Sequence, residues 1–173
     1  VDDQTRKIAD EIAEKLKFEG HWVSMQTPRQ FSGSLKVYDA VIVGGPVRMQ
    51  RYPKSLRRWV SLHAKELCLK KTAFFSVCLG ILQKDNPTVL AAERKIAQDF
   101  LAVNHWRPQI IEIFGGALAY TKYGFFTKLM MCFIAKKAGG STDISRDHEY
   151  TGWIQVNRFT DNFIMMLRQG TQA

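Results

Sequence analysis

The run Tyr38-Asp39-Ala40-Val41-Ile42-Val43-Gly44-Gly45 sets the fold class of this chain. Four consecutive apolar residues at positions 40–43 are typical of a strand buried on both faces, as the strands of a parallel sheet are. A loop follows as far as Tyr52, and Pro53 then predicts the start of a helix that ends near Leu67. The run therefore predicts a strand–loop–helix unit of an α/β domain.

Helices and strands alternate on both sides of this unit. In the first helix, expected at residues 5–18, Ile8, Ile12 and Leu16 recur at four-residue spacing, and Gly20 follows as a stop signal. Further helices are expected at 88–103 and 151–168, and further strands at 21–26, 72–79 and 110–118, with a loop or short helix at 28–36. This alternation predicts right-handed crossovers and a doubly wound parallel sheet.

The N-terminal residues Val1-Asp2-Asp3-Gln4-Thr5 lead straight into a helix. A doubly wound sheet normally begins with a strand, whose following turn presents backbone N–H groups, a hydroxyl and a helix N-terminus to phosphate. Thr5 stands where that hydroxyl belongs, although Asp2 and Asp3 also suit ordinary N-cap positions. We expect the first strand to be missing from this chain, so that one edge of the 40–43 strand is unpaired.

Composition narrows the class of protein and its partners. The 173 residues fit one domain, and Lys+Arg 25 against Asp+Glu 16 give a net charge of +9. Eight basic residues and a single acid, Glu66, lie between positions 48 and 71. Such a patch attracts nucleic acid, lipid headgroups or a carboxylate-bearing ligand. No recognised nucleic-acid motif accompanies it, so we expect no nucleic-acid partner.

The cysteines and histidines indicate no metal site. Cys68, Cys78 and Cys132 are odd in number and lack metal-ligand spacing, which favours a reducing cytoplasm. The four histidines are scattered along the chain, and a structural role is the simpler interpretation of each. We expect no metal.

The segment between the last strand and the last helix is unusually apolar. In residues 123–135 ten of thirteen residues are apolar and Lys128 is the only charge, while Lys122 precedes this run and Lys136-Lys137 close it. Thirteen residues do not span a bilayer, which takes about 20. A buried core helix and an interfacial helix beside anionic lipid headgroups both remain open. We expect residues 120–143 to form an insertion that faces the membrane or the substrate.

Several motifs together match a known family. The most specific are Trp106-Arg107-Pro108 and Gly139-Gly140-Ser141-Thr142-Asp143, which flank the insertion. The others are Asp2-Asp3-Gln4-Thr5-Arg6-Lys7-Ile8-Ala9, Gly45-Pro46-Val47-Arg48 with Tyr52, Phe74-Phe75-Ser76-Val77-Cys78-Leu79, Gly116-Ala117-Leu118 with Tyr120, and Tyr150-Thr151-Gly152-Trp153. On these motifs, which cover nearly the whole chain, the sequence resembles the flavodoxin-like, quinone-linked protoporphyrinogen IX dehydrogenases (oxidases) of bacterial haem biosynthesis.

The resemblance implies a flavodoxin-like sheet of strand order 2-1-3-4-5, with its first strand absent here, and a bound FMN. It also implies oxidation of protoporphyrinogen IX to protoporphyrin IX with a membrane quinone as electron acceptor. Ligands of such sheets bind outside the carboxyl ends of the strands. The cofactor-binding residues expected there are Asp3, Gln4, Thr5, Pro46, Val47, Arg48, Met49, Tyr52, Ser76, Val77, Cys78, Leu79 and Gly80.

Within this set we expect Thr5 to contact the FMN phosphate, backbone groups of 46–49 and 76–80 to hold the ring system, and Tyr52 to stack on it. Arg48 and Arg51 are candidates to pair with the propionates of the substrate. In the insertion, Tyr120 and Tyr123 are further candidate substrate residues. No His/Asp or paired-carboxylate arrangement is visible, so we name no catalytic side chain.

One departure from the family concerns Asp3, where the family has glycine. A carboxylate there repels phosphate and lacks the freedom of glycine at positive φ, so we expect it to weaken FMN binding. Two other functions remain open. A generic flavodoxin-type electron carrier or NAD(P)H:quinone reductase fits the fold, although the +9 charge counts against a carrier. A membrane-surface binding domain without flavin fits the missing strand and Asp3.

The membrane quinone and the apolar-basic insertion together set the expected location. We expect a peripheral protein on the cytoplasmic face of the inner or plasma membrane, where the insertion meets an anionic membrane surface.

Overall fold

The computed structural model describes residues 2–79, 87–118 and 148–169. The expected insertion 120–143 lies outside them. The described elements are, in order, α1 (Asp2–Phe18), the 3₁₀ turn η1 (Leu35–Val37), β1 (Ala40–Pro46), α2 (Lys54–Leu67), β2 (Lys71–Cys78), α3 (Pro87–Val103), β3 (Ile110–Gly115), β4 (Ala117–Leu118), β5 (His148–Glu149) and α5 (Trp153–Arg168). None of the helices in these ranges is both long and apolar enough to cross a membrane.

The main sheet is parallel, as the sequence predicts. Its three described strands have the order β1-β2-β3. Ala40 of β1 is paired with Lys71 and Pro46 with Val77, while Cys78 of β2 is paired with Gly115 of β3. The strands predicted at 40–43 and 72–79 are therefore confirmed in position and direction, and the strand predicted at 110–118 is confirmed over residues 110–115.

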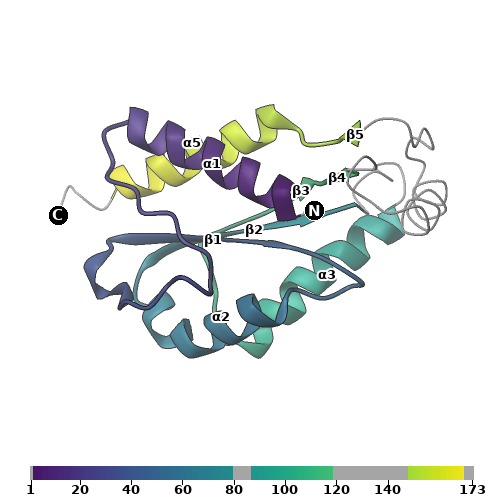
Figure 1. Cartoon of the computed structure of the whole chain (residues 1–173), viewed down its shortest axis with the longest axis horizontal. Coiled ribbons are helices and arrows are strands. Elements are labelled where there is room, and N and C mark those ends of the chain that lie inside the picture. Colours follow the sequence, from purple (N-terminus) through teal and green to yellow (C-terminus); the bar gives the residue numbers. More distant parts are fainter. Residues whose placement is uncertain (1, 80–86, 119–147, 170–173) are drawn as a thin grey trace.

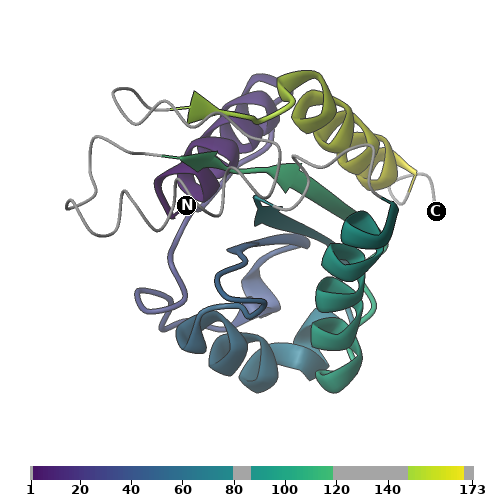
Figure 2. The same cartoon turned by 90° about the vertical axis from the view of Figure 1, so that its right-hand side faces the viewer.

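Helices cover both faces of this sheet, α1 and α5 on one side and α2 and α3 on the other (Figures 1 and 2). Adjacent residues of β2 supply the two cores, because successive side chains of a strand point to opposite faces. Phe75 packs with Phe114 and Phe159 beneath α1 and α5. Phe74 packs with Phe100, Tyr52 and Trp106 beneath α2 and α3.

The first helix ends where the sequence predicts. Gly20 has a φ of +86°, and the backbone N–H of His21 donates to the carbonyl of Leu16 at 3.0 Å. The N–H of Gly20 donates to the carbonyl of Lys17 at 2.9 Å. This pair of bonds is the Schellman arrangement, which favours glycine because the residue must be left-handed.

The strand predicted at 21–26 is wrong. Residues 21–27 form no strand, although they run along the same cavity that Ala40 to Val43 of β1 line. The physical reason is the lack of a neighbour, because a strand is defined by its ladder to an adjacent strand. A groove of about 1630 Å³ lies beside β1 where that neighbour would be.

The predicted strand 110–118 is divided in two. After Gly115 the chain leaves the main sheet, and β4 pairs with β5 in a short antiparallel ladder that the sequence did not indicate. The N–H of Gly116 donates to the carbonyl of Cys78 at 2.9 Å, and its carbonyl accepts from the N–H of Tyr150 at 3.1 Å. Gly116 thus joins the two ladders.

Candidate functional site

The start of α1 lies at the carboxyl edge of the sheet (Figure 1). Gln4 fixes this position: it is buried, and its amide Nε2 donates to the Thr151 hydroxyl at 2.8 Å. Thr151 in turn donates to the carbonyl of Gly115, the last residue of β3, at 2.8 Å. The side chain of Gln4 is therefore committed to joining α1 to β3, and only its backbone can serve as a cofactor contact. Asp3 is exposed at the same helix start.

The loop after β1 makes a tight turn at the same edge. Arg48 and Arg51 bond to each other through both N–H and carbonyl groups, at 2.9 and 3.0 Å, and the N–H of Val47 donates to the carbonyl of Val77 at 2.8 Å. At the tip, Met49 and Gln50 have φ values of +48° and +60°, and Met49 is 96% exposed. Two non-glycine residues in the left-handed region store strain, which is typical of functional loops.

Tyr52 is largely buried in the core, although it also lines the groove at this edge. It is only 4% exposed, and its ring packs against Phe74 and Phe100 with centroid separations of 5.6 and 4.5 Å. Its hydroxyl donates to the Ser76 hydroxyl at 2.8 Å, and burial raises the pKa of Tyr52 above its usual range. The expected stacking of Tyr52 on a ligand does not fit this placement. In the same turn, the side chains of Arg48, Met49, Gln50 and Arg51 are exposed.

The end of β2 contributes backbone rather than side chains. Ser76, Val77 and Cys78 are buried and Leu79 is half-buried, while Gly80 lies outside the described residues. The Ser76 hydroxyl is engaged by Tyr52. These residues were expected to hold a ring system through backbone groups, and their burial leaves that expectation intact but untested.

A buried acid that the sequence did not single out lies behind this edge. Glu93 of α3 has its Oε2 enclosed, and no hydrogen-bond partner for that atom lies in the part of the chain that the structure describes. Burial raises the pKa of Glu93, and a hydrogen bond from the Cys78 thiol opposes that rise. The available signal was spacing: Glu93 stands four residues before Ala97 and seven before Phe100, on the buried stripe of its helix.

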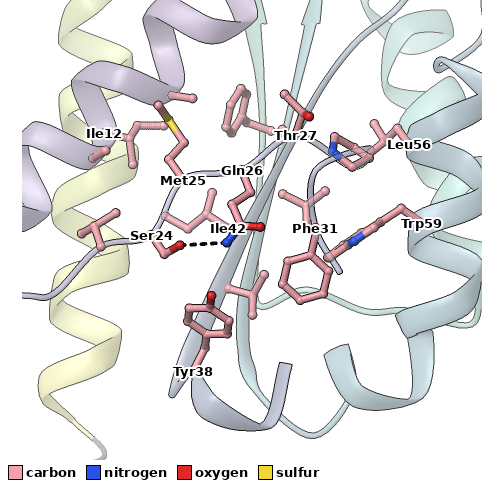
Figure 3. Close-up of a pocket in the computed structure, with 18 of the residues that line it drawn as sticks. Ile12, Ser24, Met25, Gln26, Thr27, Phe31, Tyr38, Ile42, Leu56 and Trp59 are labelled. Carbon is pink, nitrogen blue, oxygen red and sulfur yellow. Dashed lines mark hydrogen bonds between the residues drawn. The ribbon is translucent and has the colours of Figure 1, made fainter. Parts of the chain in front are cut away.

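A long groove connects the site to the open edge of β1. Thr5, Pro46 and Arg48 line it at the carboxyl end of the sheet. Figure 3 shows its middle, where Ile42 of β1 lies between Ile12 and Met25 on one side and Leu56 and Trp59 on the other. Within the 21–27 segment that lines one side of the groove, Gln26 Nε2 donates to the Ser24 hydroxyl at 3.1 Å.

These features fit a phosphate-bearing ring cofactor at the carboxyl end of the groove. The N-terminus of α1 offers backbone N–H groups and a partial positive charge, and the Thr5 hydroxyl lines the same cavity. Backbone groups of 46–49 lie opposite, at the end of β1. Arg48 and Arg51, the candidate substrate residues, also line this cavity, whereas Tyr120 and Tyr123 lie outside the described residues.

Comparison with known proteins gives consistent matches over most of the chain. Residues 1–145 match the family described as flavodoxin domain. The chain is 32% identical over 167 residues to a protoporphyrinogen IX dehydrogenase (quinone) of Leishmania major, covering 94% of this chain and 71% of that protein. It is 31% identical over 159 residues to the protein of the same name from Escherichia coli K12, covering 91% of this chain and 87% of that protein. No solved structure is a significant match.

Proposed function

The chain belongs to the flavodoxin-domain family of the protoporphyrinogen IX dehydrogenases (quinone), and we propose that it catalyses the reaction for which those enzymes are named. It is an oxidoreductase that converts protoporphyrinogen IX to protoporphyrin IX and passes the electrons to a quinone. The resemblance inferred from the motifs and the flavodoxin-like fold are both confirmed by these matches.

One structural observation supports this function most directly. The N-terminus of α1 and the strained 48–51 turn lie at one edge of the parallel sheet and line one cavity. In parallel α/β sheets this edge is where ligands bind. The flavodoxin domain indicates a bound flavin. We assign it as FMN, because a helix N-terminus with Thr5 beside it suits a terminal phosphate.

A bound flavin supplies two-electron chemistry, so the six electrons removed in forming a porphyrin correspond to three quinones reduced to quinols, with six protons transferred. The residues of this chain would bind the flavin and orient the substrate. Thr5 and the backbone of α1 would hold the phosphate, and the backbone of 46–49 the ring. Arg48 and Arg51 would pair with the propionates of the substrate. This pairing would set the orientation in which its apolar macrocycle enters the site.

We also propose that the protein acts at the cytoplasmic face of a membrane as a peripheral protein. The support is the sequence of residues 123–135, apolar except for Lys128 and bordered by lysines. Such a segment suits the surface of an anionic bilayer, where a quinone is available. Phe125→Asp combined with Met130→Asp should then abolish vesicle binding and membrane-quinone reduction while flavin content is retained. Loss of folding in that variant would identify the segment as core.

The function is tested with purified protein, its flavin measured by absorbance. Under anaerobic conditions, protoporphyrin fluorescence should rise only when both protoporphyrinogen IX and a quinone are present. Reduction of quinone by NAD(P)H without porphyrin formation would instead identify the reductase alternative.

Two variants test the site assignments. Arg48→Gln should raise the KM for protoporphyrinogen about tenfold, because one charge-assisted pair is lost. Arg58→Gln is the matched control, since Arg58 is exposed on α2 and does not line the groove. Asp3→Gly should strengthen FMN binding in a flavin titration, because phosphate loses a repelling charge. Equal affinity in wild type and Asp3→Gly would remove the phosphate assignment at α1.

A further inference from the structure

A second cavity lies between α2 and α3, and it shares only Arg51 and Tyr52 with the lining of the groove described above. Its volume is about 640 Å³, and the two helices that form it lie on the same face of the sheet (Figures 1 and 2). Three cationic side chains line it: Arg51 from the turn, Arg57 from α2 and Lys95 from α3. The only acid in its lining is Asp99, which pairs with Lys95 at 3.0 Å.

The cations near the start of α2 do not stabilise that helix. Lys54 and Arg57 occupy the first turn of α2, which has no acidic residue and no side-chain cap. The N-terminus of a helix carries a partial positive charge, so cations there are unfavourable. Within the described residues neither Arg51 nor Arg57 forms an ion pair. An anion between α2 and α3 would relieve both the dipole and the mutual repulsion of the cations.

The remaining lining is apolar. Ile96, Phe100 and Val103 of α3 face the same cavity, and Val103 is 79% exposed. A simple inorganic ion would use the cations but leave this apolar surface in water. A ligand with an anionic head and a hydrocarbon body would cover both parts.

We propose that the α2–α3 cleft binds an anionic phospholipid, with its phosphate headgroup at Arg57 and Lys95 and its first methylenes on the apolar side chains of α3. Charge complementarity carries the choice of occupant, because three cations and one acid line the cleft and leave it a net charge of +2. The site does not depend on the flavin: Arg57 and Lys95 are absent from the lining of the flavin groove.

The test uses the full chain and short-chain lipids below their micelle concentration. Dihexanoyl phosphatidylglycerol should bind with a stoichiometry of one, and dihexanoyl phosphatidylcholine at least tenfold more weakly, measured by calorimetry. Arg57→Gln and Lys95→Gln should each weaken phosphatidylglycerol binding about fivefold, the effect typical of one cation at an anionic lipid surface. Asp99→Asn should strengthen it, because Lys95 loses its partner. Asp99→Asn distinguishes an effect on lipid binding from a loss of folding, since a misfolded protein would not gain affinity.

Lys65→Gln is the matched control, because Lys65 is exposed on α2 but does not line the cleft. It should change the affinity less than twofold. A fivefold loss in Lys65→Gln would show diffuse surface attraction and overturn the site. Equal binding of phosphatidylcholine, or inorganic phosphate binding as tightly as the lipid, would overturn the lipid assignment. Turnover with a soluble quinone should be unchanged in Arg57→Gln, so the outcome is independent of the proposed enzyme activity.

Discussion

The two sides of β1 are packed in opposite ways. Toward β2, every residue from Ala40 to Pro46 has a ladder partner, and both faces of the pair are covered by helices. Toward residues 21–27 there is a groove of about 1630 Å³, with Ile42 and Leu56 along its walls. The same apolar run supplies both sides. The faces of β1 are covered because its apolar side chains pack against helices. Its edge has unpaired backbone groups, and only a further strand can pair with them.

The packed side should be the more sensitive to truncation. Phe114→Ala removes a fully buried ring that contacts Phe75 and Phe159 at centroid separations of 5.7 and 5.6 Å. We expect a loss of about 3–5 kcal/mol in the free energy of unfolding, as for other buried phenylalanines. Urea unfolding followed by circular dichroism measures it. A loss below 1 kcal/mol would mean that this side is no better packed than the groove.

Filling the groove should stabilise the fold. A strand of apolar residues, joined ahead of Val1 through a short turn, would run parallel to β1 and complete its ladder. Each apolar side chain it buries contributes about 1.5–3 kcal/mol, largely offset by about 1–2 kcal/mol per residue for ordering the backbone. We expect a net gain of roughly 2 kcal/mol and tighter FMN binding. The control strand has proline at its central positions, which cannot donate to a ladder, and should give neither gain.

Ile42 should be less sensitive than Phe114, because it is half-buried and borders the groove. We expect Ile42→Ala to cost below about 2 kcal/mol, under the usual range for buried isoleucine. In the strand-filled protein the same substitution should cost more, since the side chain would then be enclosed. Equal costs in the two backgrounds would show that the added strand does not enter the groove.

The smallest effect expected concerns Glu93 and the dependence of stability on pH. The pKa of Glu93 is raised in the fold from the usual 4.5, so the fold favours the neutral acid. This stability is fully present below pH 4.5 and is lost as the pH rises through the raised pKa. The melting temperature of Glu93→Gln, relative to wild type, should therefore rise with pH.

Glu66→Gln is the control with the opposite sign. A hydrogen bond with His63 lowers the pKa of Glu66, so its stability is present above the usual value and lost as the pH falls through the lowered pKa. The melting temperature of this variant relative to wild type should fall as the pH rises. The same slope in both variants would rule out the burial of Glu93 as the cause.

Much of the architecture could be predicted from local patterns. The apolar run at 40–43 indicated a strand, four-residue spacing indicated α1, and Gly20 indicated the end of that helix; the structure confirms all three. Each of these three features depends on residues that are close in the sequence or on the periodicity of apolar residues. The sequence is therefore enough to predict them. The motifs at Trp106-Arg107-Pro108 and around Pro46 likewise indicated the family that the comparisons show.

Other features were decided only by tertiary structure. Residues 21–26 are composed like a strand, but no neighbouring strand completes a ladder with them. Tyr52 looked like a stacking residue, yet the folded chain turns its ring onto Phe74 and Phe100 and leaves Met49 at the exposed tip. Glu93 became a buried acid because α3 places it against Cys78. For Tyr52 and Glu93 the deciding contact joins residues far apart in the chain, and for residues 21–26 such a contact is lacking. Local sequence fixes which residues prefer burial, whereas the partner that meets them depends on how the whole chain packs.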